Sequence, residues 1–302
     1  MGNNQTSCFH IIKIRGLEPS HLKPIMMSHG WINLSPFSRN ADGFSYSFSL
    51  SEELPITISI KTSRKAVECY ADISLTKIER EKLSRHLNRI LSLDFPLKSF
   101  QELCLQKGER AIHTLAKKGW GRMLRAATPW EDAVKTLLTT NASWPYTVRM
   151  CQDLVQTVGK TTSNGCRTFP TARQLIRFLK TGDTTGLRLG YRIVYLTCLM
   201  EKALRTDSWL NEPRLKIPQG ELSKRISKWK GFGPYAASHI LMLMGLHSYL
   251  PVDREVARYL KITSSLPRVG LNKLDHLSDW GDFRFTAYKL FRVLKKENWI
   301  GG

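Results

Sequence analysis

Short runs of alternating or β-branched residues dominate the first third of the chain. These runs are FHIIKI, FSYSFSL, ITISI and AVECYADISL, separated by Asn-Ala-Asp-Gly and Ser/Pro-rich stretches. A period of two bounded by turn residues predicts antiparallel strands joined by hairpins. A helical pattern, TKIEREKLSRHLNRILSL, follows them. Its apolar residues expected close to one face are Ile78, Leu83, Leu87, Ile90 and Leu91.

From residue 97 onward the apolar positions recur mainly with a helical period. The expected helices are PWEDAVKTLLTT, FPTARQLIRFLK, GYRIVYLTCLMEKAL, ELSKRISKWK, YAASHILMLMGL, REVARYLKI and FTAYKLFRVLKKE. The first begins with Thr128 as an N-cap and a proline directly after it, and Thr171 caps the second. The pattern therefore predicts an α+β protein, with a small antiparallel sheet domain over residues 1–96 and a mostly helical domain over 97–302.

Positive charge is concentrated in the helical part. The formal net charge is +21, of which residues 1–100 carry +4 and residues 101–302 carry +17. Lys and Arg displace the counterions condensed on nucleic acid, so this bias favours a polyanion binder. A generally basic protein with no such partner is the alternative.

Cysteine usage and hydropathy bear on the compartment. The six cysteines are scattered singly, and no Cys-x-x-Cys pair encodes a zinc or iron–sulfur site. Free thiols in a reducing compartment are expected, in the cytoplasm or nucleoid, or in the nucleus of a eukaryote. The longest apolar run, within SHILMLMGLHSYLPV, is too short to span a bilayer. The start MGNNQT matches the loose myristoylation pattern through Gly2 and Thr6, and lipidation is not expected from it.

The segment 226–253 joins a glycine turn between two helical patterns to a carboxylate. Gly231 and Gly233 are expected to permit a tight turn that leaves amides at the second helix N-terminus facing outward. Such amides and the positive helix end bind anions, and Lys228 and Lys230 add charge. A plain helical hairpin explains the glycines equally well, so the turn alone leaves both interpretations open.

Asp253 follows Gly233 by twenty residues and directly precedes REVARYL. It is a natural helix N-cap there, and a cap keeps a carboxylate ionised. An ionised carboxylate at this distance from the turn can do chemistry on a nucleotide that the turn would hold.

This segment resembles the helix-hairpin-helix-Gly-Pro-Asp motif of base-excision DNA glycosylases. The family pattern is Leu-Pro-Gly-Val-Gly, a small-residue helix and Val-Asp; here it is Trp-Lys-Gly-Phe-Gly, Ala-Ala and Pro-Val-Asp, with Lys230 in place of the turn proline. The resemblance covers most of 100–302. The β-rich N-terminal part resembles the extra domain of 8-oxoguanine and 3-methyladenine II glycosylases. The resemblance as a whole implies an enzyme that flips a damaged base out of duplex DNA and uses Asp253 to cleave the glycosidic bond of that base.

Two further elements carry the resemblance to the 8-oxoguanine enzymes. LLTTNASW is similar to the helix end that fills the gap left by a flipped base, which points to Asn141. GLRLGYRIVYL is similar to their Gly-Tyr-Arg element, implying a stacking wedge at Tyr191 and an Arg192 near the partner base. Their second arginine, five residues after the wedge Asn, is Tyr146 here, which implies looser selection of the opposite base and favours alkylated bases.

The same resemblance bears on strand cleavage. Bifunctional members place a nucleophilic lysine four positions after the first hairpin glycine, where this chain has Tyr235. A phenol forms no Schiff base, so a monofunctional glycosylase using water is expected. Tyr235 is then expected to line the base pocket, with His239 one turn on, Trp144 and Phe291. Packing in the core is the alternative for His239 and for Phe291.

The expected partner is double-stranded DNA with a damaged base, bound by a monomer with no membrane involvement. No cofactor or metal is expected, and a monovalent or divalent cation at the hairpin phosphate site is left open. An alkylated purine such as 3-methyladenine is the favoured substrate, and 8-oxoguanine or a deaminated base is the alternative. Two other functions compete: a non-catalytic DNA-binding protein and a bifunctional glycosylase/lyase.

Overall fold

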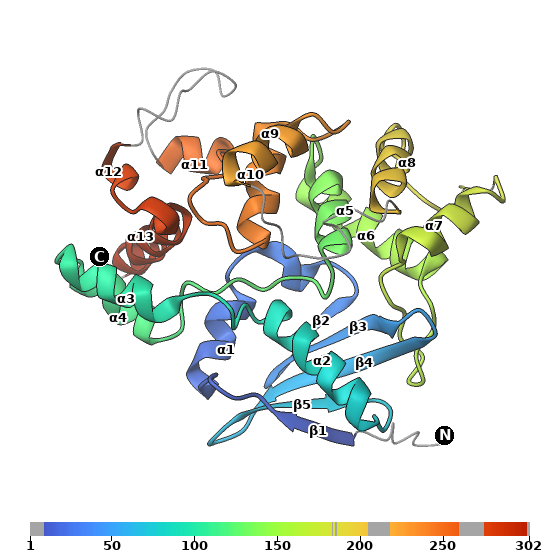
Figure 1. Cartoon of the computed structure of the whole chain (residues 1–302), viewed down its shortest axis with the longest axis horizontal. Coiled ribbons are helices and arrows are strands. Elements are labelled where there is room, and N and C mark those ends of the chain that lie inside the picture. The colour runs from blue at the N-terminus through green and yellow to red at the C-terminus, as the bar shows by residue number, and fades with distance from the viewer. Residues whose placement is uncertain (1–8, 183, 185, 205–217, 260–274, 301–302) are drawn as a thin grey trace.

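A computed structural model of the chain describes residues 9–182, 184, 186–204, 218–259 and 275–300. The myristoylation-like residues Gly2 and Thr6 lie outside this part. The polypeptide forms an antiparallel sheet at one end and a larger group of helices at the other (Figure 1). None of the described helices is long and apolar enough to cross a membrane.

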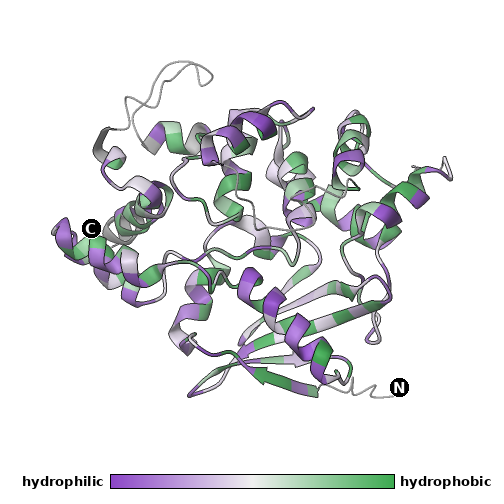
Figure 2. Cartoon of the chain, in the orientation of Figure 1, coloured by the Kyte–Doolittle hydropathy of each residue, from purple (hydrophilic) through white to green (hydrophobic). Residues whose placement is uncertain are grey.

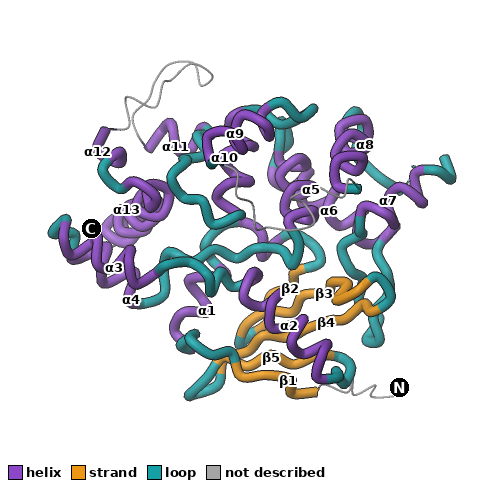
Figure 3. The backbone as a smooth tube through the Cα atoms, in the orientation of Figure 1, coloured by secondary structure: helices purple, strands orange, loops and turns teal. Residues whose placement is uncertain are grey.

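The sheet has five strands in the order β1-β5-β4-β3-β2, each pair antiparallel (Figure 3). The strands are β1 (Phe9–Lys13), β2 (Phe37–Asn40), β3 (Gly43–Ser51), β4 (Leu54–Thr62) and β5 (Val67–Ala71). Four of them coincide with the predicted runs. The short edge strand β2 was not predicted, because only Phe37 of its four residues is buried and it has no alternating pattern.

Helix α2 (Lys77–Ile90) lies across one face of the sheet (Figure 1). Its start is fixed by a capping box, in which Thr76 accepts from the Glu79 amide and the Glu79 carboxylate accepts from the Thr76 amide. The helix buries Leu83, Leu87 and Ile90. The expectation that Ile78 shares this face is wrong, since its side chain is 76% exposed in the first turn.

The other regular elements of the described residues are helices. They are α1 (Pro19–Met26), η1 (Gly30–Asn33), α3 (Leu97–Gln106), α4 (Arg110–Lys117), α5 (Pro129–Thr139), α6 (Trp144–Val158), α7 (Ala172–Leu179), α8 (Arg192–Ala203), α9 (Gln219–Ser227), α10 (Pro234–Leu243), α11 (Arg254–Tyr259), α12 (Asp275–Ser278), η3 (Gly281–Phe283) and α13 (Arg284–Ile300). The seven helices predicted after residue 97 correspond to α5, α7 to α11 and α13. Helices α3, α4 and α6 were not singled out in the sequence.

The sheet and the helices share one hydrophobic core. A single cluster of buried side chains in mutual contact includes residues of both parts, from Ile11 in β1 to Leu290 in α13. The segment with α1 and η1 therefore packs against both parts of the molecule, and it places residues 29–31 beside the helices that form the site described below. The division at residues 96 and 97 stays a prediction.

Candidate active site

Helices α9 and α10 form a tight hairpin around Phe232. This side chain is buried, its amide donates to the Trp229 carbonyl at 3.0 Å, and the two rings meet edge to face at 5.5 Å. Ala236 and Ala237 are fully packed on the facing side, where small side chains allow the helices to approach closely. In Figure 2 α9 is mainly hydrophilic and α10 mainly hydrophobic, so the hairpin exposes one helix and buries the other.

The two glycines of the turn have different roles. Gly231 has φ +83°, and a Cβ there would lie 2.5 Å from Leu137 Cδ1 and 2.8 Å from Tyr195 Cδ2. Gly233 has φ −99°, and a Cβ would meet nothing within 4 Å. The expectation that both glycines are needed for the turn is thus wrong for Gly233. Its missing side chain instead leaves open space in front of α10, whose first-turn amides lack intrahelical acceptors.

A cavity of about 870 Å³ opens beside this hairpin. Its lining joins four parts of the chain: η1, the end of α5 with the start of α6, α10 to α11, and α13. The aromatic members of the lining are Trp31, Trp144, Tyr235, Phe285 and Tyr288. Trp144 closes one side by packing on Gly30, where a Cβ would lie 2.3 Å from its ring. The volume is within the range of small-molecule sites and accommodates a purine.

Asp253 lines this cavity and caps α11. Its Oδ1 accepts from the Val256 amide at 2.7 Å, and its carbonyl accepts from the Ala257 amide at 2.9 Å. The cap fixes where the carboxylate lies relative to the cavity. A fixed anion at the edge of a cavity lined by rings is suited to stabilising positive charge on a bound group.

Tyr235 and His239 lie one turn apart on α10 and face the same cavity. Burial and then the charge of Asp253 raise the pKa of the Tyr235 hydroxyl to about 12, so it keeps its proton. Burial and then the charge of Lys289 lower the pKa of His239 to about 4, so its ring is neutral at pH 7. The Tyr235 oxygen lies 3.5 Å from His239 Nδ1.

An open groove adjoins the cavity, and Asn141 borders both. The groove is lined by residues from the end of α5, the start of α8 and the hairpin turn, namely Thr140, Asn141, Tyr191, Tyr195, Gly231, Phe232 and Gly233. Asn141 is exposed and has φ +49°, a left-handed conformation that Asn adopts more readily than most residues. Arg192 donates through Nη2 to the carbonyls of Thr140 and Asn141, at 2.6 and 3.0 Å. These bonds hold the backbone that presents Asn141.

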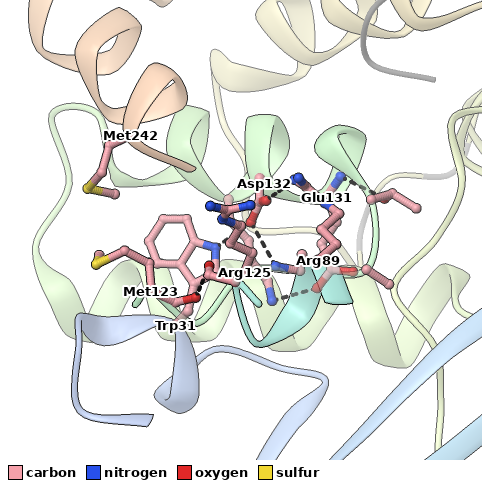
Figure 4. A network of polar contacts seen from close by, with 12 residues as sticks. Trp31, Arg89, Met123, Arg125, Glu131, Asp132 and Met242 are labelled. Atoms are coloured by element: carbon pink, nitrogen blue, oxygen red, sulfur yellow. Dashed lines mark hydrogen bonds and ion pairs between the residues drawn. The ribbon is translucent and has the colours of Figure 1, made fainter. Parts of the chain in front are cut away.

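A buried network of polar side chains connects Trp31 in the cavity lining with α5 and with α2 (Figure 4). Asp132, on α5, accepts from Trp31 Nε1 at 2.7 Å and from the Ala126 amide at 3.0 Å through Oδ1. Its other oxygen, Oδ2, accepts from Arg89 on α2. Trp31 in turn lies 5.1 Å from His239, ring centre to ring centre. The Asp132 carboxylate therefore sets the position of an indole that lines the cavity.

Comparisons with known proteins agree with this architecture. The structure of Clostridium acetobutylicum 8-oxoguanine glycosylase/lyase in its apo form covers 92% of this chain and 94% of its own, with a TM-score of 0.68 and 19% identity. The 3-methyladenine DNA-glycosylase from Archaeoglobus fulgidus covers 93% and 96%, with a TM-score of 0.70 and 16% identity. The chain has the fold of the helix-hairpin-helix DNA glycosylases.

Sequence comparison points to the same glycosylase fold. The N-glycosylase/DNA lyase of Saccharomyces cerevisiae is 27% identical over an alignment of 197 residues that covers 60% of this chain. That match spans about half of the yeast protein, 52% of its length. No protein-family model matches the chain. A second Clostridium acetobutylicum structure, in complex with double-stranded DNA that has cytosine opposite 8-oxoguanine, aligns with a TM-score of 0.68 and 19% identity over 96% of both chains.

Within the glycosylase fold most predicted site residues come together. Those that line the cavity are Asn141, Trp144, Tyr235, His239 and Asp253. Those that line the groove are Asn141, Tyr191, Gly231 and Gly233. Lys228 and Lys230 are exposed at the hairpin, outside both linings. The roles assigned to these residues stay predictions.

Two predicted residues pack mainly against the protein itself. Phe291 does not line the cavity: its ring meets Trp280 edge-on at 5.8 Å, because it is on the core side of α13. Arg192 is only 4% exposed, and its guanidinium is engaged with loop carbonyls and stacked 4.7 Å from the Tyr191 ring. It supports the Asn141 loop, and its contact with a partner base stays a prediction.

Three of the cavity residues that sequence reasoning missed bear on the chemistry of the site. His29 caps η1 and Trp31 lies within it, in the N-terminal part, and Lys289 belongs to α13. No local pattern marks the first two as part of a site, since tertiary packing alone brings them there. Lys289 had a usable signal: it is a charged residue in the apolar stretch FTAYKLF, two positions before the expected Phe291.

The turn glycines give a matched pair of variants. Gly231→Ala should lower the free energy of unfolding by about 1–3 kcal/mol, since it combines left-handed strain with a clash. Gly233→Ala should leave the unfolding midpoint nearly unchanged and weaken duplex DNA binding by crowding the anion site. Urea unfolding and fluorescence anisotropy with a labelled duplex measure the two effects. Equal stability losses would contradict the distinction between the glycines.

Proposed function

We propose that this protein is a monofunctional DNA glycosylase of base excision repair. The observation that carries the proposal is the placement of Asp253 in the cavity beside the α9–α10 hairpin, with Asn141 between cavity and groove. The hairpin binds backbone phosphate, the cavity receives an extruded nucleotide, and Asn141 with Tyr191 fills the vacated stack. The glycosylase fold and the DNA complex of a structural neighbour support this reading.

Asp253 acts on the sugar of the extruded nucleotide. Cleavage of the glycosidic bond leaves positive charge on the deoxyribose, which the capped carboxylate stabilises. The carboxylate also orients or deprotonates the attacking water, whose oxygen forms the new bond to the sugar while the base leaves. No cofactor enters this scheme.

Tyr235 is the reason for proposing hydrolysis without strand cleavage. It holds its proton and offers no amine at the turn of α10. The yeast relative is named an N-glycosylase/DNA lyase, so lyase activity is the second candidate. An amine is present in the cavity at Lys289, on the wall formed by α13. Its charge lowers the pKa of both His29 and His239.

The cavity charges change the expected base. The sequence favoured an alkylated purine, but Lys289 and Arg292 line the cavity. Two cations in the cavity repel a base that carries positive charge, such as 3-methyladenine as a nucleoside. We therefore place neutral carbonyl-bearing bases ahead of alkylated ones.

Base release and strand cleavage can be separated in one assay. DNA treated separately with alkylating, oxidising and deaminating agents is incubated with the protein, and mass spectrometry identifies the released bases. We expect release of a damaged base, with the strand cut only after alkali treatment. Borohydride should trap no covalent adduct; a trapped adduct that is lost in Lys289→Met would contradict monofunctional hydrolysis and assign the lyase amine. Absence of any released base would contradict the glycosylase proposal.

A further inference from the structure

His239 presents a buried polar atom at the cavity. The side chain is 8% exposed, and its Nε2 has no hydrogen-bond partner within the part of the chain that the structure describes. A buried polar group without a partner costs roughly 1–3 kcal/mol, so such an atom beside a cavity marks a place where a ligand completes the bonding. His239 is thus a candidate contact for the base.

The proton of the neutral His239 ring belongs on Nε2. The Tyr235 hydroxyl keeps its proton and lies 3.5 Å from Nδ1, and we assign it as the donor to that nitrogen. In a neutral imidazole the other nitrogen then carries the hydrogen. Nε2 is therefore a hydrogen-bond donor toward the cavity.

His29 repeats this arrangement from the N-terminal part. Its Nδ1 accepts the Trp31 amide at 3.1 Å, which leaves the ring hydrogen on Nε2. That Nε2 is also buried without a hydrogen-bond partner among the described residues. Burial, His239 and Lys289 hold the pKa of His29 well below its ordinary value, while the nearby Leu124 carbonyl acts in the opposite direction. The two imidazoles lie 6.2 Å apart, centre to centre.

Lys289 adds a third donor. It lines the same cavity, and its charge lowers the pKa of both imidazoles. An ammonium group donates and never accepts. The three side chains, which we call the donor floor, are His29, His239 and Lys289.

We propose that the donor floor selects a purine in which deamination has replaced an amino group by a carbonyl, as in hypoxanthine or xanthine. The inference rests on the proposed glycosylase function. Deamination converts an N–H donor on the base edge into an oxygen acceptor. Adenine at C6, or guanine at C2, would direct an amino group at buried donors and leave both sides without partners, whereas hypoxanthine at C6, or xanthine at C2, places an oxygen there that accepts from them. The positive Lys289 also disfavours a cationic methylated purine.

Single-lesion duplexes test the base preference directly. The wild-type chain is assayed on duplexes that contain one hypoxanthine, xanthine, 8-oxoguanine or 3-methyladenine, with adenine and guanine duplexes as parents. We expect hypoxanthine or xanthine to be released with a kcat/KM at least about tenfold above the other four bases.

Two variants test whether the donor floor sets this preference. His239→Phe and Lys289→Met should each lower kcat/KM for the deaminated base by about 10- to 100-fold. The ratio of kcat/KM for the deaminated base to kcat/KM for 8-oxoguanine should fall in both variants. Binding to a duplex with a tetrahydrofuran abasic site should be unchanged, because no base occupies the cavity in that complex. His10→Phe is the matched control, since His10 is on the outer strand β1 and does not line the cavity.

The outcomes separate the two proposals. Release of 8-oxoguanine or 3-methyladenine in preference to both deaminated bases would overturn the donor-floor proposal and keep the glycosylase. An unchanged base preference in both variants would also overturn it. No release of any base by the wild-type chain would overturn the glycosylase function and the base selection together.

Discussion

Asp253→Asn should reduce base release by about 10³-fold or more while the protein remains folded and bound to DNA. The carboxamide keeps the oxygen that accepts from the Val256 amide, and Asn is as good a helix cap as Asp. It carries no charge, however, and neither stabilises a cationic sugar nor removes a proton from water. Single-turnover release from a lesion duplex measures the loss, and anisotropy with the same duplex confirms binding.

Asp282→Asn is the matched control for the Asp253 variant. Asp282 is an exposed carboxylate in η3, outside the cavity lining, and its loss should leave the rate of base release near that of the wild type. Release by the Asp253 variant within about tenfold of the wild-type rate would contradict its proposed role on the sugar. A loss of both release and binding would place Asp253 in DNA binding instead.

Asp132→Ala should lower the free energy of unfolding by about 3–5 kcal/mol, the largest stability effect that the structure predicts. The carboxylate is 1% exposed and accepts from Trp31, the Ala126 amide and Arg89. Its removal leaves a nearly buried guanidinium without its counterion and an indole N–H without an acceptor. Urea unfolding at pH 7 measures the change.

Glu221→Ala gives the comparison for a solvent-exposed ion pair. Glu221 pairs with Arg225 at the surface of α9, with 49% and 59% of their side chains exposed, and its loss should cost less than about 1 kcal/mol. Similar effects of the two substitutions would show that the Asp132 network contributes little to the free energy of unfolding.

The network also predicts a kinetic effect in Asp132→Ala: a mobile Trp31 should raise KM for the damaged duplex.

The elements with strong local signals were predictable from the sequence. The capping box at Thr76 and the N-cap at Thr171 define helix starts through bonds between residues three apart, so the sequence contains the whole interaction. The alternating runs of β3 and β4 likewise predict a two-sided sheet. Edge strand β2 has no such signal, because its pairing with β3 depends on the fold around it.

The candidate site was only partly predictable for a related reason. Tyr235 and Asp253 lie within one motif, whose spacing brings them to one cavity. Phe291 was misplaced because a helical period does not say which apolar side chain of α13 turns toward a cavity and which toward Trp280. His29 was missed because its partners, His239 and Lys289, are more than two hundred residues further along the chain.

The cavity walls come from opposite ends of the described sequence, from Gly30 near its start to Lys289 near its end. A chain leaves the ribosome from its N-terminus, so α13 is the last of these walls to be synthesised. The hairpin of α9 and α10 is complete before then. A nascent or truncated chain that stops before α13 would therefore have the groove for DNA but would lack the α13 wall of the cavity. We expect such a chain not to cleave the glycosidic bond.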